Sequence, residues 1–161
     1  AGTAAVVTYA TRRPDLSNNG PTVTRLFVYG TLRRGCRAHH MLRRAAREIV
    51  TAEACGQLYA LPEGYPAFLH GSGTVVGHLV TVHESRARKL IQQLDLYEGC
   101  FGTGHPSSLY TREAISVRVV DTNADGDAQV YVYADAARAR GLGTRIDEGD
   151  WLAARAAAAR A

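Results

Sequence analysis

The stretch Arg25-Leu26-Phe27-Val28-Tyr29-Gly30-Thr31-Leu32-Arg33-Arg34-Gly35 decides the fold of this chain. It begins as a hydrophobic run, stops at a glycine, continues as a short polar loop and closes at a second glycine. This pattern predicts a strand over residues 23–29 that leads into a loop whose backbone can approach another group closely. Loops at the end of a rigid strand often carry binding or catalytic groups, so this loop is the first candidate for a functional site.

The length and composition of the chain are those of one ordinary globular domain. The chain has 161 residues, of which 46% are hydrophobic and 21% charged. No apolar run approaches the roughly 18 residues that span a membrane, and the first residues show no signal-peptide pattern. Residues 1–22 contain two prolines and several Ser, Asn and Gly residues. We therefore expect a flexible, irregular N-terminal arm over 1–22, a single domain over 23–161, and no membrane partner.

The cysteines favour a reducing compartment. Cys36, Cys55 and Cys100 are an odd and sparse set, which does not form a disulfide framework, so we expect a cytoplasmic protein. Cys36 together with His39 and His40 could suggest a metal cluster. Because no fourth ligand stands at a recognisable spacing, we predict no metal site.

The positive charge of the chain is modest and comes mainly from arginine. The formal net charge is +4, and Lys89 is the only lysine. Six arginines lie between residues 33 and 47, without the interleaved aromatics that nucleic-acid binding favours. We interpret them as a solvated helix face and expect no nucleic-acid partner. Weak binding to an anionic surface stays as a third hypothesis, which steep salt dependence would support.

Predicted strands outnumber predicted helices along the chain. We expect strands over residues 23–29, 49–61, 74–83, 109–120 and 129–134, a short extended segment over 65–68, and helices over 38–47, 85–97 and from about 150. Turns are expected at 62–64, 71–73 and 123–127. Several strands are joined by hairpin-length turns and no regular βαβ alternation occurs. The predicted class is α+β, a small mixed β-sheet or partial barrel with flanking helices.

The loop Gly30-Thr31-Leu32 could form a cradle for an oxygen atom. Successive backbone N–H groups in a turn converge on an anion or a polarised carbonyl. The loop is not a phosphate-binding Walker loop, because it lacks a second glycine followed by Lys and Ser or Thr. Taken alone, a simple turn is the commoner reason for a glycine after a strand.

A second candidate feature is the acidic segment Leu94-Asp95-Leu96-Tyr97-Glu98-Gly99. Glu98 falls at the predicted C-terminus of the helix over 85–97, and Gly99 can end that helix in a left-handed conformation. The helix dipole disfavours a negative charge there by about 0.3–1 kcal/mol, and partial burial would also raise the carboxyl pKa. Such a group suits proton transfer near neutral pH. A tolerated surface glutamate is the alternative that the residues alone leave open.

The motifs taken in order resemble the γ-glutamylcyclotransferase-like superfamily. Tyr-Gly-Thr-Leu-x-x-Gly is followed about 65 residues later by Leu-Asp-x-Tyr-Glu-Gly. The later matches are Tyr110 with Arg112, then Val130-Tyr131-Val132-Tyr133, then Gly149-Asp150-Trp151. The resemblance runs from about Leu26 to Trp151. Tyr65-Pro66-Ala67 and the Gly-Ser-Gly turn point to the compact branch that includes the γ-glutamylamine cyclotransferases.

The resemblance implies a role for particular residues of this chain. The substrate loop, whose backbone binds the γ-glutamyl moiety, would be formed by Tyr29, Gly30, Thr31 and Leu32. The family commonly has Ser at the position of Thr31, and this change keeps the hydroxyl. Glu98 would be the catalytic glutamate. Tyr110 and one of Tyr131 or Tyr133 would line the pocket, and of these two we choose Tyr133. Neither a metal nor an organic cofactor is implied.

The implied activity is cyclisation of a γ-glutamyl amine or amide to 5-oxoproline, with release of the free amine and Glu98 as general acid/base. The expected partner is a small-molecule γ-glutamyl substrate, and the expected assembly a monomer or small homo-oligomer. A non-catalytic ligand-binding or regulatory member of the same fold is the alternative. The leaving group could be an amino acid, a lysine adduct or a protected biosynthetic intermediate; the arginine- and alanine-rich composition suggests a high-GC bacterial source, which suits the last.

Overall fold

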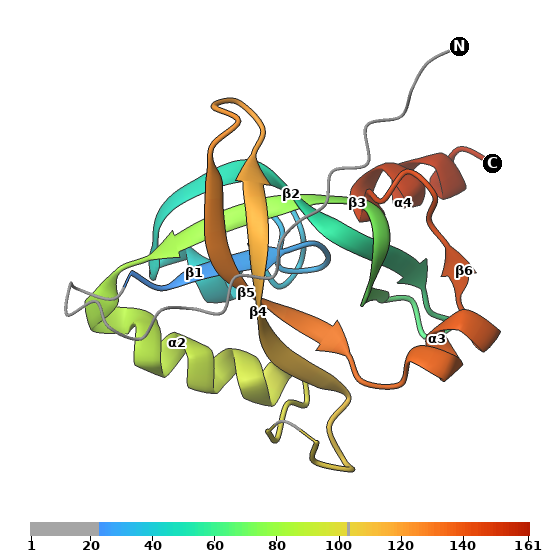
Figure 1. Ribbon diagram of the computed structural model, residues 1–161, viewed down its shortest axis with the longest axis horizontal. Coiled ribbons are helices and arrows are strands. Elements are labelled where there is room, and N and C mark those ends of the chain that lie inside the picture. The colour runs from blue at the N-terminus through green and yellow to red at the C-terminus, as the bar shows by residue number, and fades with distance from the viewer. Residues whose placement is uncertain (1–22, 103) are drawn as a thin grey trace.

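The protein is described by a computed structural model that covers residues 23–102 and 104–161, so the arm expected over residues 1–22 lies outside the described residues (Figure 1). The strands are β1 (Arg25–Val28), β2 (Ala46–Ala60), β3 (Pro66–Val82), β4 (Tyr110–Val119), β5 (Asp125–Tyr133) and β6 (Thr144–Arg145). The helices are α1 (His40–Arg43), α2 (Glu84–Tyr97), α3 (Ala136–Leu142) and α4 (Trp151–Ala159). Within these described ranges no helix has the length and apolarity needed to cross a bilayer.

The strands form a closed barrel. Their order in the sheet is β3-β1-β5-β4-β2-β6, and an additional pairing between β3 and β2 closes the first five into a ring. The barrel is mixed, because β1 pairs antiparallel with β3 and parallel with β5. Figure 1 shows α2 packed across one side of the barrel, α3 beside β6, and α4 next to the C-terminus. The α+β class with a small mixed sheet is therefore confirmed, and closure is complete over five strands.

The long strand β3 differs from the expectation of two segments separated by a turn. It pairs with β2 on both sides of the Gly71-Ser72-Gly73 segment, with Gln57 opposite Leu69 and Cys55 opposite Thr74. The intervening residues of β3 form a bulge, since they exceed the single residue between the paired positions of β2. A bulge of this kind bends a strand and increases its twist, which helps the long β2–β3 hairpin wrap around the barrel.

Three further elements depart from the sequence-based expectation. The helix expected over 38–47 is limited to α1, because Ala46 pairs with Val82 and begins β2. Helix α3 was not predicted; Asp135 caps it by accepting a hydrogen bond from the Arg138 N–H. The two-residue strand β6 was not predicted either, and it exists through its pairing with the end of β2. In each of these three elements, strand pairing or helix capping determines the local structure and outweighs the hydrophobic pattern.

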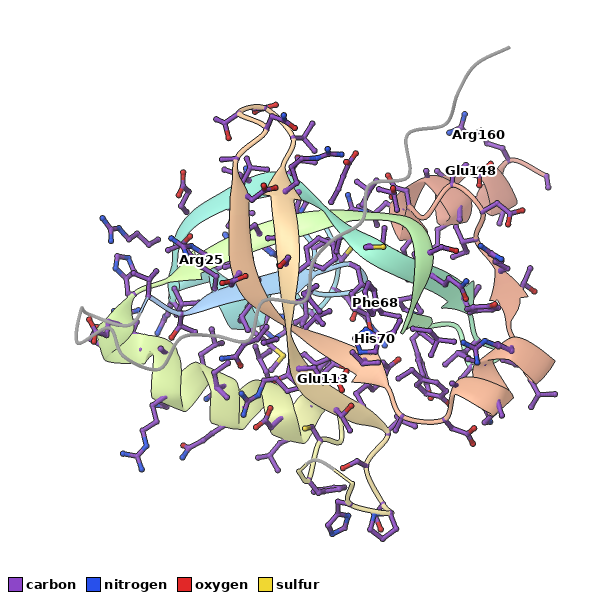
Figure 2. All side chains as sticks on the ribbon, in the orientation of Figure 1. Arg25, Phe68, His70, Glu113, Glu148 and Arg160 are labelled. Atoms are coloured by element: carbon purple, nitrogen blue, oxygen red, sulfur yellow. The ribbon has the colours of Figure 1, made fainter. Side chains whose placement is uncertain are left out.

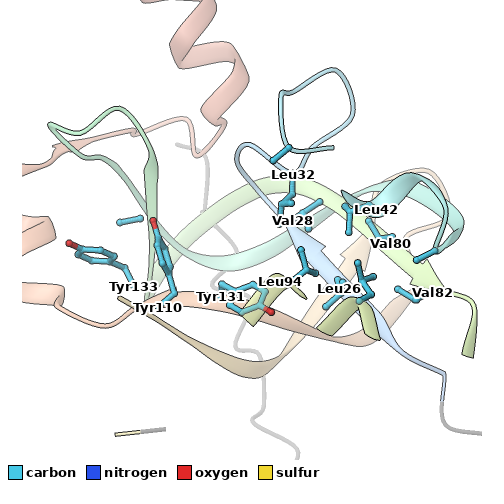
Figure 3. Close-up of a cluster of buried hydrophobic side chains, with 14 of the residues drawn as sticks. Leu26, Val28, Leu32, Leu42, Val80, Val82, Leu94, Tyr110, Tyr131 and Tyr133 are labelled. Atoms are coloured by element: carbon cyan, nitrogen blue, oxygen red, sulfur yellow. The ribbon is translucent and has the colours of Figure 1, made fainter. Parts of the chain in front are cut away.

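Strand β1 is buried on both of its faces, and this accounts for its continuous hydrophobic run. Leu26 and Val28 belong to one core cluster, which Figure 3 shows together with Leu94 of α2. Phe27 belongs to the second cluster, which includes Trp151. Successive strand residues point to opposite faces, so one strand serves both clusters. The buried Trp151, at the start of α4, packs this helix against the barrel.

Candidate active site

A cavity of about 240 Å³ lies at the end of β1. Its walls include the loop Tyr29–Leu32 that follows β1, Glu98 after α2, and tyrosines from β4 and β5. The two motifs singled out in the sequence therefore meet across one cavity, although about 65 residues separate them. The volume lies just below the roughly 300–1,000 Å³ of typical small-ligand pockets, which suits a small metabolite or part of a larger one.

The loop Tyr29–Leu32, which lines this cavity, contains backbone N–H groups that have no partner among the described residues. Its carbonyl groups are used within the loop: Gly30 O accepts from Arg33 N at 3.0 Å, and Thr31 O accepts from Ala38 N at 3.1 Å. In contrast, the N–H groups of Thr31 and Leu32 donate to no acceptor within the described residues. Two adjacent free N–H groups in the wall of a cavity form a site for a carboxylate or a developing oxyanion.

Gly30 is required for the position of this loop. A Cβ atom built on Gly30 would lie 2.5 Å from Cγ of Pro66, which itself lines the cavity. The loop can therefore pass this close to the start of β3 only with glycine. The glycine after the strand is thus a close-approach position, which the sequence alone could not distinguish from a simple turn.

Glu98 occupies the C-cap of α2, as the sequence predicted. Its N–H donates to Leu94 O at 2.8 Å, and Gly99 follows with a φ of +61°. The side chain is partly buried and lines the cavity. Burial raises the pKa of the Glu98 carboxyl from 4.5 to about 7. A carboxyl that titrates near neutral pH can both accept and donate a proton during one reaction cycle.

Asp95 fixes the end of α2 to the barrel. Its carboxylate accepts hydrogen bonds from Arg112 Nε at 2.9 Å and from the Tyr131 hydroxyl at 2.7 Å. The second Arg112 contact runs to the other Asp95 oxygen at 3.2 Å, and Arg112 also donates to Gln129 Oε1 at 2.5 Å. Arg112 is therefore neither a free surface group nor available to a substrate carboxylate. It holds the last turn of α2, and with it Glu98, against β4 and β5.

Two of the cavity tyrosines, Tyr29 and Tyr110, donate their hydroxyl protons to the protein backbone. The Tyr29 hydroxyl donates to Tyr131 O at 2.6 Å, and the Tyr110 hydroxyl donates to Pro66 O at 2.6 Å. Burial, together with the nearby carboxyl of Glu98, raises the pKa of both hydroxyls. Both residues therefore shape the cavity wall, and their hydroxyl protons form hydrogen bonds to backbone carbonyls.

Tyr131, and not Tyr133, lines the cavity, so the structure corrects our choice between the two. Tyr133 packs edge-to-face against Tyr110 with ring centroids 5.3 Å apart, and its hydroxyl accepts from Arg138 at 3.1 Å. Figure 3 shows Tyr133 beside Tyr110, whereas Tyr131 lies nearer Leu94 of α2. Both tyrosines lie on the same face of β5, so alternation along the strand could not distinguish them.

Several residues at the cavity mouth were missed by sequence reasoning. They are Arg37, Tyr65, Tyr97 and Leu109. Tyr97, at the end of α2, is 43% exposed, and its hydroxyl lies 3.2 Å from Thr31 Oγ1. The sequence signal that could have identified these four residues is their position, because each lies close to a motif residue or to a predicted strand end.

A buried ion pair supports the loop from behind. Arg33 is 6% exposed, so the prediction of a solvated arginine is wrong at this position. Its Nη1 donates to Asp150 Oδ1 at 2.7 Å, and the same carboxylate accepts from the N–H groups of Leu152 and Ala153 at the start of α4. Asp150 therefore links the loop that follows β1 to the C-terminal helix α4.

The pair formed by His70 and Glu113 lies outside the cavity. His70 Nε2 is 2.7 Å from Glu113 Oε2 in an exposed hollow beside β3 and β4, and Figure 2 labels both residues. In the described part of the chain, no three Cys, His, Asp or Glu side chains are grouped as a metal site requires.

Comparison with known proteins identifies this architecture. The profile of the family described as gamma-glutamyl cyclotransferase, AIG2-like, matches residues 26–153. The gamma-L-glutamyl-butirosin B gamma-glutamyl cyclotransferase of Niallia circulans is 32% identical over 108 residues, which are 67% of this chain and 65% of that protein. This chain thus matches slightly less than two thirds of that relative's length.

Two solved structures have the same fold. YkqA from Bacillus subtilis superposes with a TM-score of 0.64 and 23% identity, covering 87% of this chain and 44% of YkqA. An AIG2-like protein from Mus musculus gives a TM-score of 0.62 and 24% identity, covering 80% of this chain and 88% of that one. The barrel is therefore the γ-glutamylcyclotransferase-like fold. With the family match over most of its length, the chain belongs to the AIG2-like gamma-glutamyl cyclotransferase family.

Proposed function

We propose that the protein cyclises a γ-glutamyl amine or amide to 5-oxoproline and releases the free amine, with Glu98 as general acid/base. One observation carries the proposal. A carboxyl with a pKa of about 7 shares a small cavity with the free N–H groups of Thr31 and Leu32. Family membership supports cyclotransferase chemistry, and the site supplies the two functions that this chemistry requires: proton transfer and stabilisation of an oxyanion.

The reaction proceeds within one substrate molecule. The α-amine of the glutamyl group, whose ordinary pKa is about 7.7–8.0, loses a proton to the Glu98 carboxylate as it attacks the γ-carbonyl carbon. A C–N bond forms, closing a five-membered ring, and the carbonyl oxygen becomes an oxyanion that accepts hydrogen bonds from the loop. The original amide C–N bond then breaks, and Glu98 returns its proton to the departing nitrogen. No net proton, electron or water is consumed.

The shape of the cavity suits this intramolecular step. The enzyme has no second reactant to gather, so its task is to hold the bent conformer in which the amine reaches the carbonyl. Tyr29, Tyr110 and Tyr131 provide fixed walls for that conformer because each hydroxyl has a protein partner. The γ-glutamyl moiety would fill the interior, and the leaving amine would extend toward the mouth.

The relative from Niallia circulans is named as a gamma-glutamyl cyclotransferase that acts on gamma-L-glutamyl-butirosin B, which supports γ-glutamyl cyclisation as the chemistry of this chain. The shared step would be attack of the glutamyl α-amine on its own γ-carbonyl. The amine that this chain releases has to be identified by experiment. The alternative, a binding protein without catalysis, would have no need of a desolvated carboxyl beside the loop.

The proposal is tested by incubating the protein with a panel of γ-glutamyl amides and γ-glutamyl amines. The expected result is equimolar appearance of 5-oxoproline and free amine from at least one compound, measured by mass spectrometry. Binding of these compounds without product from any of them would favour the non-catalytic alternative.

A further inference from the structure

The cavity mouth carries one charged side chain that the proposed reaction does not use. Arg37 and Glu98 are the charged residues among those that line the cavity. Within the described ranges, the Arg37 guanidinium has no ion pair and no side-chain hydrogen bond. In contrast, Arg33 forms an ion pair with Asp150, and Arg112 forms one with Asp95.

Arg37 and Glu98 differ in their exposure to solvent and in their role in the cavity. The raised pKa of Glu98 has burial as its cause, with no contribution from a cation. Arg37 is exposed, whereas Glu98 is partly buried. The Arg37 guanidinium, at the exposed rim, and the Glu98 carboxyl, deeper in the same cavity, would therefore contact different parts of a bound molecule.

The parts of a γ-glutamyl substrate can be assigned to these positions. The reacting amine and γ-carbonyl must lie at Glu98, and the free N–H groups of Thr31 and Leu32 serve the oxygens of the glutamyl portion. The rim then faces the departing amine. We propose that Arg37 is a specificity-determining residue that binds an anionic group, a carboxylate or a phosphate, carried by the leaving amine. This inference rests on the proposed function.

The rest of the rim indicates which probe is suitable. Tyr97 and Leu109 line the mouth and are 43% and 41% exposed, so an apolar group on the leaving amine would contact them. γ-Glutamyl-phenylalanine and γ-glutamyl-phenylalaninamide share such a group and differ in the carboxylate alone. They isolate the contribution of charge at nearly constant shape.

The experiment compares kcat/KM for these two compounds in the wild type, in Arg37→Ala and in Arg47→Ala, an exposed arginine of β2 outside the cavity. A guanidinium–carboxylate contact at an exposed rim predicts a preference of about five- to tenfold for the carboxylate in the wild type. In Arg37→Ala the ratio should fall to about one, and in Arg47→Ala it should match the wild type. A second pair, γ-glutamyl-phosphoethanolamine and γ-glutamyl-ethanolamine, differs in a phosphate group. Comparing the preferences within the two pairs shows whether Arg37 favours a phosphate or a carboxylate.

Binding supplies a second readout that does not depend on turnover. The dissociation constants of both phenylalanine compounds are measured by calorimetry in Glu98→Gln, with and without Arg37→Ala, and should show the same loss of preference. Equal losses for the acid and the amide, or no preference in the wild type with either pair, would overturn the role of Arg37. If the binding preference holds but no compound yields 5-oxoproline, the proposed reaction fails and the role of Arg37 stands.

Discussion

Replacing Glu98 by Gln should stabilise the fold at alkaline pH while removing the acid/base group. The Glu98 pKa rises from 4.5 to about 7 through burial, so the folded state holds this proton more tightly than the unfolded state. The resulting stability is fully present below about pH 4.5, is lost as pH rises toward 7, and stays lost above it. At about 1.4 kcal/mol per pH unit, the ionised carboxylate costs at most about 3 kcal/mol at pH 8.

The amide of Gln is nearly isosteric and carries no charge, so the variant avoids this cost. We expect Glu98→Gln to exceed the wild type in unfolding free energy by about 1–3 kcal/mol at pH 8, and to match it near pH 4.5. Urea denaturation at a series of pH values measures this difference. Glu148→Gln is the matched control, because Glu148 is exposed near α4 (Figure 2) and should show no such trend. Equal or lower stability of Glu98→Gln at pH 8 would refute the desolvation argument.

Two further substitutions test the supports of the site. Asp95→Asn should leave the part-buried Arg112 without a counter-ion and loosen the contact to Tyr131, lowering the unfolding free energy by about 1–3 kcal/mol and reducing kcat/KM for 5-oxoproline release; full activity would show that this network does not position Glu98. Asp150→Ala removes both the cap of α4 and the partner of a buried arginine, Arg33, and should cost about 3 kcal/mol or more in urea denaturation. A loss below about 1 kcal/mol would contradict that account.

Sequence patterns predicted the elements whose residues interact locally. The hydrophobic run before Gly30 gave β1, and the helical spacing of residues before Glu98 gave α2 with its C-terminus in the right place. The assignment of both motifs to one site, in contrast, rests on the resemblance to the γ-glutamylcyclotransferase-like superfamily and not on either motif alone. The ends of β1 and α2 were predictable because strand ends and helix ends carry strong local signals, glycine above all.

The remaining features depend on contacts between distant segments. Whether Tyr131 or Tyr133 enters the cavity is decided by how β5 crosses α2, since the two residues share a face. The burial of Arg33 depends on Asp150, more than a hundred residues further along the chain. The short α1 results from Ala46 pairing with β3. Such pairings leave no local pattern in the sequence.

Proton transfer by Glu98 is the step on which the proposed reaction depends. The most direct measurement compares the rate of 5-oxoproline formation by the wild type and Glu98→Gln, using a γ-glutamyl substrate from the panel and confirming by calorimetry that the variant still binds it. General acid/base catalysis predicts a fall in kcat of about 10²–10⁴-fold with binding retained. A fall of less than about tenfold in a folded variant that still binds substrate would contradict the assignment.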